Sequence, residues 1–229
     1  MKYINEFKNK HLNEDIWVIC AGSSMNYVDP SFFENKTTIG LNHVGVKYKT
    51  NYTVIKDLVV NGFNELANCE NPPFNSDYVI ASEWDKGYGY TLNTDITLNK
   101  TYEKYQDKFY FFKHIKNGHG NTTAIKKDSD MLFISTSTIT TAVHFAGYMG
   151  AKNIMICGHD LLAIDNKLYF DEYTKKSNQG TQKYWNNRDF KNDTMKLRDI
   201  MKQEYDTNIY TLNPFIGFGL EGHTYDSYE

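Results

Sequence analysis

The sequence predicts an α/β fold, a Rossmann-like and mostly parallel sheet flanked by helices, with a small lid insertion. Short apolar runs that end in small or polar residues recur along the chain, and segments with helical spacing lie between several of them. The 229 residues, 40% of them hydrophobic, are enough to bury a sizeable core. We therefore expect a single domain over residues 1–229, in which 161–190 forms the lid-like insertion.

The first expected strand covers residues 15–20, Asp-Ile-Trp-Val-Ile-Cys, and a turn that contains Gly22, Ser23 and Ser24 follows it. The turn matches neither G-x-G-x-x-G nor the Walker pattern, and a tight strand-to-helix connection explains it as well as a ligand site does. Ligands of open parallel sheets bind at the carboxyl ends of strands, where the N–H groups of small residues can approach a phosphate. These three residues are therefore candidate nucleotide ligands.

The next expected strands follow in the first half of the chain. They cover residues 37–42, 52–57, 77–82 and 108–113. Helical stretches are expected from Asp29-Pro30 and over 58–67, and a mobile or ligand-ordered loop over 114–130. The second and third strands end in Asn42, which can donate and accept hydrogen bonds, and in Asp57, which can bind a ribose hydroxyl or a divalent ion.

The periodicity that predicts helices and strands is clearer in the second half of the sequence. Apolar residues between Ile139 and Met149 recur at helical spacing, Ser137 or Thr138 can cap the first turn, and Gly150 stops the helix. The remaining elements are a strand over 153–157 that ends in Gly158, His159 and Asp160, then the insertion, a helix over 189–205 and a strand over 208–214.

The carboxyl ends of parallel strands meet along one edge of a sheet, so we expect the turn at Gly22, Asn42, Asp57 and the Gly158–Asp160 segment to converge. Polar residues also end strands because loops are solvated, and for any one position both explanations stay open. The hydroxyls of residues 135–138 lie at a helix N-terminus, which favours a phosphate, whereas an N-cap accounts for one of them. The added candidate nucleotide ligands are Ser137, Thr138, Gly158, His159 and Asp160.

The composition of the chain and its missing motifs argue against several classes of function. The net charge is −3 and the lysines are dispersed, so nucleic acid is not an expected partner. No segment reaches the apolar length of a membrane span, so we expect a soluble protein. Cys20 and Cys157 fall in apolar strands and Cys69 is isolated, which indicates core packing in a reducing cytoplasm. No metal-ligand spacing and no G-x-S-x-G occur, so neither a metal site nor acyl hydrolysis is expected.

Among the histidines, two are candidates for acid/base chemistry. His119 lies in a Gly-rich loop and His159 lies at the end of an expected strand. His144 falls within the expected helix after the hydroxyl cluster, and we expect it to be a packed or surface residue.

Four segments carry a resemblance to known proteins: Val-Ile-Cys-Ala-Gly-Ser-Ser at 18–24, Ile-Gly-Leu-Asn at 39–42, Tyr-Thr-Val-Ile-Lys-Asp at 52–57 and, most specifically, residues 137–160. In this order they resemble the bacterial lipooligosaccharide sialyltransferases and the related α/β domain of motility accessory factors and archaeal hydroxymethylpterin diphosphokinases. The resemblance covers about residues 15–215. It implies a nucleotide-binding α/β domain with a lid, which binds a cytidine monophosphate (CMP) sugar and needs no obligatory metal or cofactor.

The resemblance also implies nucleotide contacts. It places Gly22, Ser23, Ser24 and Asn42 on the nucleotide. A third-strand position that is asparagine in the sialyltransferases falls on Asp57, and the serine at the helix start falls on Ser137 or Thr138.

For catalysis, Tyr169 resembles one of two family tyrosines that stabilise the departing phosphate, and Leu162 stands where the other is expected. The family's general base is a histidine in the lid. This sequence has Arg188 and Asp189 in that region, and there Arg188 could clamp a phosphate and Asp189 could act as the base.

The leading hypothesis is a glycosyltransferase that moves a sugar from a nucleotide, with a CMP-sugar favoured, to a glycan or small-molecule hydroxyl. Tyr169 assists departure of the nucleotide, and Asp189 or a loop histidine such as His119 deprotonates the acceptor. An alternative is a magnesium-dependent diphosphokinase of the hydroxymethylpterin type, with Asp57 and Asp160 as ligands of the ion. A nonenzymatic nucleotide-binding module is a third hypothesis, and the chain is compatible with a homo-oligomer.

Overall fold

The computed structural model describes residues 2–56, 74–85, 90–91, 105–115, 121–135, 137–160, 164–173 and 188–212. In these ranges one sheet has the strand order β1-β8-β5-β4-β3-β2-β10-β11, with β9 beside β8, and all of its pairs are parallel. Its strands are β1 (Lys2–Tyr3), β2 (Asp15–Ile19), β3 (Thr37–Leu41), β4 (Thr50–Ile55), β5 (Ser76–Ser82), β8 (Phe109–His114), β9 (Met131–Leu132), β10 (Asn153–Cys157) and β11 (Asn208–Leu212). A separate antiparallel pair joins β6 (Trp84–Asp85) and β7 (Tyr90–Thr91).

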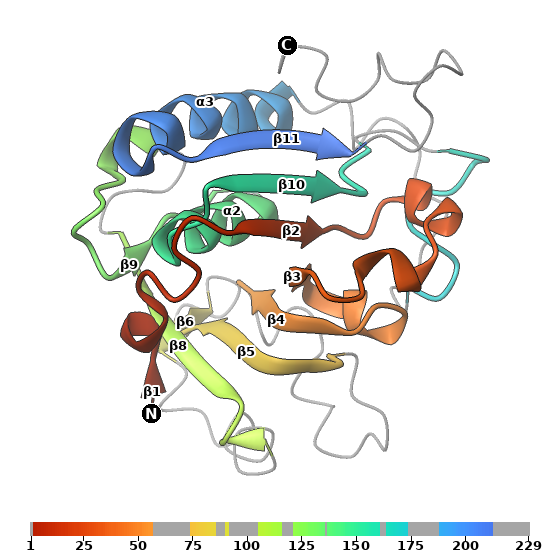
Figure 1. The fold of residues 1–229 in the computed structure, drawn as a ribbon, viewed down its shortest axis with the longest axis horizontal. Helices are drawn as coiled ribbons and strands as arrows, with labels where there is room; N and C mark the ends of the chain where they lie inside the picture. Colours follow the sequence, from red (N-terminus) through yellow and green to blue (C-terminus); the bar gives the residue numbers. More distant parts are fainter. Residues whose placement is uncertain are drawn as a thin grey trace.

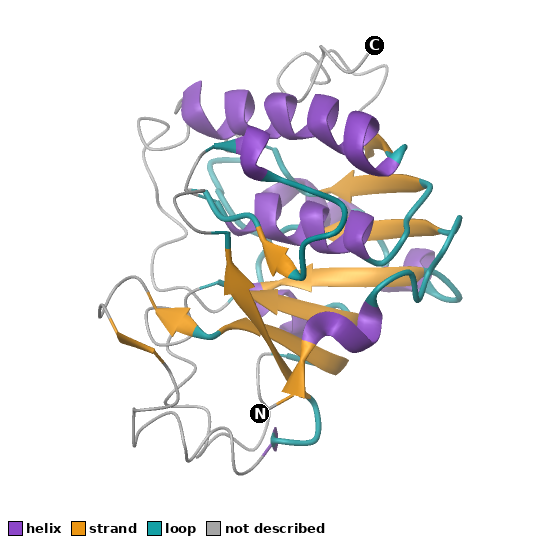
Figure 2. Cartoon of the chain, turned by 90° about the vertical axis from the view of Figure 1, so that its left-hand side faces the viewer, coloured by secondary structure: helices purple, strands orange, loops and turns teal. Residues whose placement is uncertain are grey.

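In the described ranges, two α-helices and several short 3₁₀ helices pack around the sheet. The α-helices are α2 (Thr138–Tyr148) and α3 (Arg188–Tyr205), and the 3₁₀ helices are η1 (Ile4–Phe7), η2 (Ser23–Tyr27), η3 (Pro30–Phe33), η4 (Asn42–Val46) and η7 (Thr122–Ala124). In Figure 1 the arrowheads of β2, β10 and β11 point to the same side of the molecule, and η2 follows the end of β2 there. Figure 2 shows the two long helices, which contact each other, one above the other.

The expected α/β fold is confirmed, and most expected strands agree with the structure to within two residues. The strand over 153–157 and the helix after Ser137 are found as expected. The stretch after Asp29 is the 3₁₀ helix η3, whose first turn Asp29 caps by accepting a hydrogen bond from Ser31 N–H. At one of the shifted boundaries, Asn42 lies outside β3 and begins η4, with a φ of 50°. The expected helix over 58–67 and Cys69 lie outside the described residues.

A large part of the core lies between the sheet and α2. Along β2, Ile16 and Val18 are fully buried, whereas the half-buried Trp17 between them packs on Phe32 of η3, with 5.2 Å between ring centroids. Helix α2 contacts β2, β3, β4 and β10 and has no exposed face, because α3 covers it on the other side. A helix that precedes a neighbouring parallel strand runs antiparallel to it, so α2 begins at the edge where the strands end.

The N-terminal residues add a part of the core that the sequence did not indicate. Strand β1 pairs with β8, and Phe7 of η1 is buried against Tyr52, Tyr110 and Phe145, at centroid distances of 5.4, 4.6 and 5.9 Å. These edge-to-face contacts join the N-terminal segment to the core.

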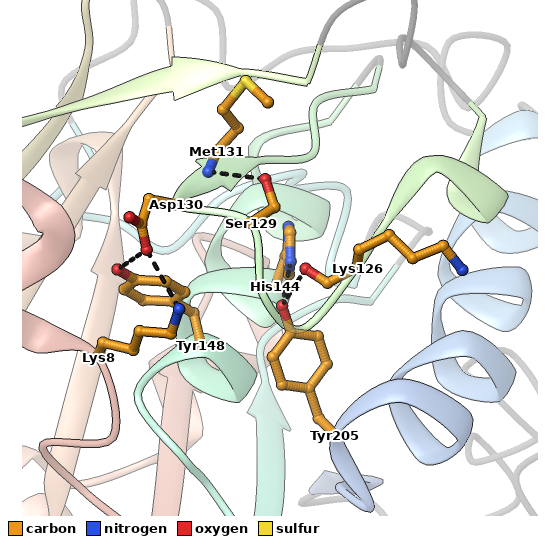
Figure 3. A network of polar contacts seen from close by, with 8 residues as sticks. All are labelled: Lys8, Lys126, Ser129, Asp130, Met131, His144, Tyr148 and Tyr205. Atoms are coloured by element: carbon orange, nitrogen blue, oxygen red, sulfur yellow. Dashed lines mark hydrogen bonds and ion pairs between the residues drawn. The ribbon is translucent and has the colours of Figure 1, made fainter.

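A buried histidine connects α2 to α3 (Figure 3). His144 Nδ1 accepts the backbone N–H of Phe133 at 2.9 Å, so its proton lies on Nε2 and is donated to the Tyr205 hydroxyl, also at 2.9 Å. Tyr205 in turn reaches the carbonyl of Lys126 at 3.4 Å. His144 is fully buried, so of the two alternatives expected from the sequence, a packed or a surface residue, the packed one is correct. Burial lowers the pKa of His144 to about 3.

This pKa predicts an acid-labile fold. Between pH 6.5 and about 3 the unfolded chain binds a proton at His144 that the folded chain does not, so stability present above pH 6.5 is lost as the pH falls. The loss reaches about 1.4 kcal/mol per pH unit for one such group. We expect His144→Gln to be less stable at neutral pH but to have a shallower dependence of unfolding free energy on pH. Denaturant titrations between pH 7 and 4.5 measure both slopes, and equal slopes would contradict the prediction.

Candidate functional site

Strands β4, β3, β2 and β10 are neighbours in the sheet, and all four are parallel. Their carboxyl ends therefore lie along one edge, as the sequence predicted. This edge carries the turn at Gly22 after β2, Asn42 after β3, Lys56 after β4, and Gly158 to Asp160 after β10. Asp57 lies outside the described residues.

The turn after β2 is hydrogen-bonded to the end of β10. Gly22 N–H donates to the Gly158 carbonyl at 2.8 Å. Ser24 donates both its backbone N–H, at 2.7 Å, and its hydroxyl to the Asp160 carboxylate. Burial raises the pKa of Asp160, and the two bonds from Ser24 oppose that shift. Both oxygens of this carboxylate therefore serve to hold the turn in place.

Residues 164–173, from the expected lid, lie against the same turn. Tyr169 forms an antiparallel bridge with Gly22, and Phe170 N–H donates to the Ala21 carbonyl at 3.1 Å. The hydroxyl of Ser23 accepts the N–H of Ile164 at 3.2 Å. This part of the insertion is therefore docked on the candidate site, which brings Tyr169 beside Gly22.

Tyr173 continues this contact toward β3. Its ring stacks on Tyr169, with centroids 4.7 Å apart and an interplanar angle of 25°, and meets His43 edge-on at 5.8 Å. Burial raises the pKa of Tyr173, and the nearby Tyr169 adds to this shift, whereas polar interactions of the hydroxyl with the His43 backbone and the Asn42 side chain oppose it. The sequence did not single out Tyr173.

A buried cation lies at the same edge beside the start of α2. The Lys56 ammonium donates to the Ser135 carbonyl at 2.9 Å, and Ser135 comes two residues before the N-cap of α2. Ser137 occupies that N-cap, and Thr138 is the first helical residue, but the Ser137 hydroxyl makes no capping hydrogen bond. The expectation that a hydroxyl caps this helix is therefore wrong, since Ser137 fills the position without the bond. Lys56 adds a positive charge that the sequence analysis missed.

The structure describes the remaining candidate site residues only in part. His159 is half-buried, and burial lowers its pKa to about 3, so its imidazole is neutral near pH 7 and cannot supply a proton as an acid there. Arg188 and Asp189 begin α3, whose start lies at the carboxyl edge of the sheet because the helix runs antiparallel to β11, but their side chains lie outside the described part. His119 and Leu162 lie outside it entirely.

Within the described ranges, His, Cys, Asp and Glu side chains form no cluster of three that could hold a metal ion. No helix in the described part of the chain has the length and apolar character needed to cross a bilayer. Cys20 and Cys157 are both buried and free, and burial raises the pKa of each thiol.

A cavity of about 320 Å³ lies at the opposite edge of the sheet. It is lined by residues that precede β10 and β11, including Lys152 and Asp206, and by Gly150 after α2. Because the strands begin at this edge, the cavity is separate from the candidate site.

The parallel order of the sheet, with a small-residue turn and a helix start at the strand ends, defines an α/β protein of the kind that binds ligands at this edge. The fold is similar to that of the sialyltransferase CstII from Campylobacter jejuni. The CMP complex of CstII has a TM-score of 0.52 and 17% identity over 89% of this chain and 81% of that one. Its complex with CMP-3FNeuAc has a TM-score of 0.52 and 17% identity over 90% and 84% of the two chains.

A third structure, CST-II in complex with a trisaccharide acceptor and CMP, gives a TM-score of 0.50 and 16% identity over 88% and 82% of the two chains. At this identity the comparison shows a shared fold. No protein-family model and no curated protein sequence matches the chain. The resemblance to sialyltransferases is thus confirmed for the fold, and the link to motility accessory factors and pterin kinases stays a prediction.

Proposed function

We propose that this protein is a sialyltransferase-like glycosyltransferase that uses a nucleotide-activated sugar, preferably a CMP-sugar, and an acceptor hydroxyl on a glycan or small molecule. One observation carries the proposal: the Gly22 turn, Asn42, Tyr169 and the start of α2 lie at one edge of a sheet whose fold is shared with CstII. The CstII structures were solved with CMP, with CMP-3FNeuAc, and with a trisaccharide acceptor together with CMP.

The described residues suit the phosphate and the nucleoside of such a donor. The N-terminus of α2 and the ammonium of Lys56 provide positive potential for a phosphate. Asn42, further along the edge, can hydrogen-bond the nucleoside. Tyr169, held beside the turn, is the candidate that stabilises charge on the leaving phosphate.

In the proposed reaction the bond between the sugar and the phosphate oxygen breaks as the acceptor oxygen bonds to the anomeric carbon. The acceptor proton passes to a base, for which Asp189 and His119 are the candidates, and CMP departs. Docking of residues 164–173 beside the turn places Tyr169 where it can help to exclude water.

A thermal-shift panel of CMP, UMP, AMP, GMP and ATP, each with magnesium and with a chelator, tests the proposal. A ligand that binds only the folded state raises the melting temperature, by mass action. We expect CMP to raise it in the chelator as well as in magnesium, and the protein to release CMP from CMP-sialic acid when acceptor glycans are supplied. Stabilisation by ATP alone, and only with magnesium, would contradict the proposal and favour a diphosphokinase.

A further inference from the structure

The cavity of about 320 Å³ at the edge where β10 and β11 begin has walls that the backbone holds in place. Its lining comes from four parts of the chain, within residues 9–13, at 127, within 147–152 and within 202–208. Asn13 N–H donates to the Gly150 carbonyl at 2.8 Å, and Asn208 N–H donates to the Lys152 carbonyl at 3.0 Å. Three of the four parts are therefore joined by backbone hydrogen bonds. A preformed cavity of this size suits a small ligand.

The charged residues of the lining are three lysines and one aspartate: Lys127, Lys152, Lys202 and Asp206. At neutral pH they leave two net positive charges, although the whole chain has a net charge of −3. Lys202 forms an ion pair with Asp206 at 2.5 Å. Within the ranges that the structure describes, the ammonium groups of Lys127 and Lys152 form no ion pair and no hydrogen bond. Two cations of the cavity are thus available to an anion from outside the protein.

The carboxylate of Asp206 shows how an anion fares at this place. The hydrogen bond and the charge of Lys202 lower its pKa most, and the charges of Lys152 and Lys127 lower it further, whereas desolvation opposes the shift. All three ammonium groups therefore lie close enough to favour one negative charge beside the cavity. Asp206 is exposed, so its pair with Lys202 is screened by water and leaves most of this positive potential in place.

The uncharged part of the lining can bind hydroxyl groups. It includes Asn9, Asn13 and Asn208, whose amides can both donate and accept hydrogen bonds, and the half-buried ring of Tyr205. Positive φ values of 57° and 64° also favour asparagine at positions 9 and 13. The contribution of hydroxyl groups therefore has to be measured apart from that of the charge.

We propose that this cavity is a second ligand site, which binds an anionic sugar, that is, a saccharide with a carboxylate or a phosphate group. Lys127 and Lys152 pair with the anionic group, and the asparagines bind the hydroxyls. A sugar acid and a sugar phosphate share this chemistry. Because the cavity lies at the edge opposite the candidate site, the inference does not depend on the proposed transferase function.

Calorimetric titrations with N-acetylneuraminic acid, glucose 6-phosphate, glucose, acetate and inorganic phosphate test the inference. We expect at least one of the two anionic sugars to bind about tenfold or more tightly than glucose, which lacks the charge, and than the matching bare anion, which lacks the hydroxyls. This is the usual effect of losing one hydrogen bond to a charged group. The anionic sugar that binds more tightly shows whether a carboxylate or a phosphate is preferred.

The Asp206→Asn variant should bind the anionic sugar about two- to fivefold more tightly than the wild type, the range for one exposed ion pair. The substitution removes the protein's own anion from Lys202 and adds no bulk. Asparagine also tolerates the φ of 54° at this position. A gain in affinity cannot come from a damaged fold, so the same titration remains informative where other variants are unstable.

The double variant Lys127→Gln, Lys152→Gln should weaken binding of the anionic sugar by about tenfold or more. The matched control is Lys49→Gln, Lys196→Gln, which removes two exposed lysines outside the cavity and changes the net charge equally. We expect the control to bind the anionic sugar as the wild type does. Equal losses in the two double variants would indicate overall charge and would overturn the inference.

Four other results would also overturn it. They are no binding of either anionic sugar, equal binding of the sugars and the bare anions (an adventitious ion only), no gain in Asp206→Asn, and binding that Lys56→Met abolishes but the Lys127→Gln, Lys152→Gln variant keeps. The last result would place the sugar in the candidate site at the carboxyl edge. The thermal shift with CMP should be the same in all cavity variants. If the wild type does not bind CMP, the proposed function fails and this inference stands.

Discussion

We expect Gly22→Ala to destabilise the protein by about 1–3 kcal/mol, the usual effect of overpacking, and to abolish CMP binding. A Cβ at this position would overlap the Gly158 carbonyl oxygen and the Asp160 carboxylate. The carbonyl belongs to the backbone and accepts the N–H of Gly22 itself at 2.8 Å, so it cannot move aside without opening the turn. Denaturant unfolding measures the stability, and the thermal shift with CMP measures binding.

Gly40→Ala provides a control in the adjacent strand. A Cβ there would meet the side chains of Thr50, at 3.1 Å, and Val44, at 3.3 Å, which can shift by a few tenths of an ångström. We expect a smaller loss of stability, about 1 kcal/mol or less, and normal CMP binding. If Gly22→Ala binds CMP as tightly as the wild type, the turn after β2 is not part of the site.

The sequence was sufficient to predict the sheet and the edge on which the site lies. An apolar run such as Asn153–Cys157 can bury both of its faces, which is typical of a parallel strand, and the helix before it was indicated by the spacing from Ile139 to Met149. Once strands are parallel, their ends must share an edge. The convergence of Gly22, Asn42 and Asp160 therefore followed from local pattern alone.

The contacts that complete the site could not be predicted in this way. Tyr173 lies far along the chain from Asn42, in a segment without helical or strand periodicity, and it is one of 18 tyrosines. Nothing local distinguishes it from a packing residue. Ser137 illustrates the opposite error, because the sequence predicts the cap position correctly but cannot show whether the hydroxyl turns toward the helix.

Lys56 was missed for a related reason. A lysine at the end of a strand is normally solvated, and its burial here depends on the Ser135 carbonyl, 79 residues further along the chain. The packing of β4 against α2 helps to bury this side chain. Long-range partners of this kind leave no trace in local composition.

The second large effect is expected at this lysine: Lys56→Met should weaken CMP binding by about 10- to 100-fold, the range for loss of a hydrogen bond to a charged group. Methionine is similar in length and apolar, so it fills the space beneath the α2 N-terminus but removes the positive charge. The loss should depend on the phosphate. Cytidine, which lacks one, should bind the variant and the wild type alike, and calorimetry with both ligands measures the difference.

Lys49→Met is the matched control, because Lys49 is exposed and immediately precedes β4, at the opposite edge of the sheet. Removing its charge changes the net charge as much as Lys56→Met does but leaves the candidate site intact, so CMP affinity should not change. If both variants weaken CMP equally, the effect comes from overall charge rather than from a placed ammonium. If Lys56→Met weakens cytidine as much as CMP, the lysine supports the shape of the site and does not bind the phosphate.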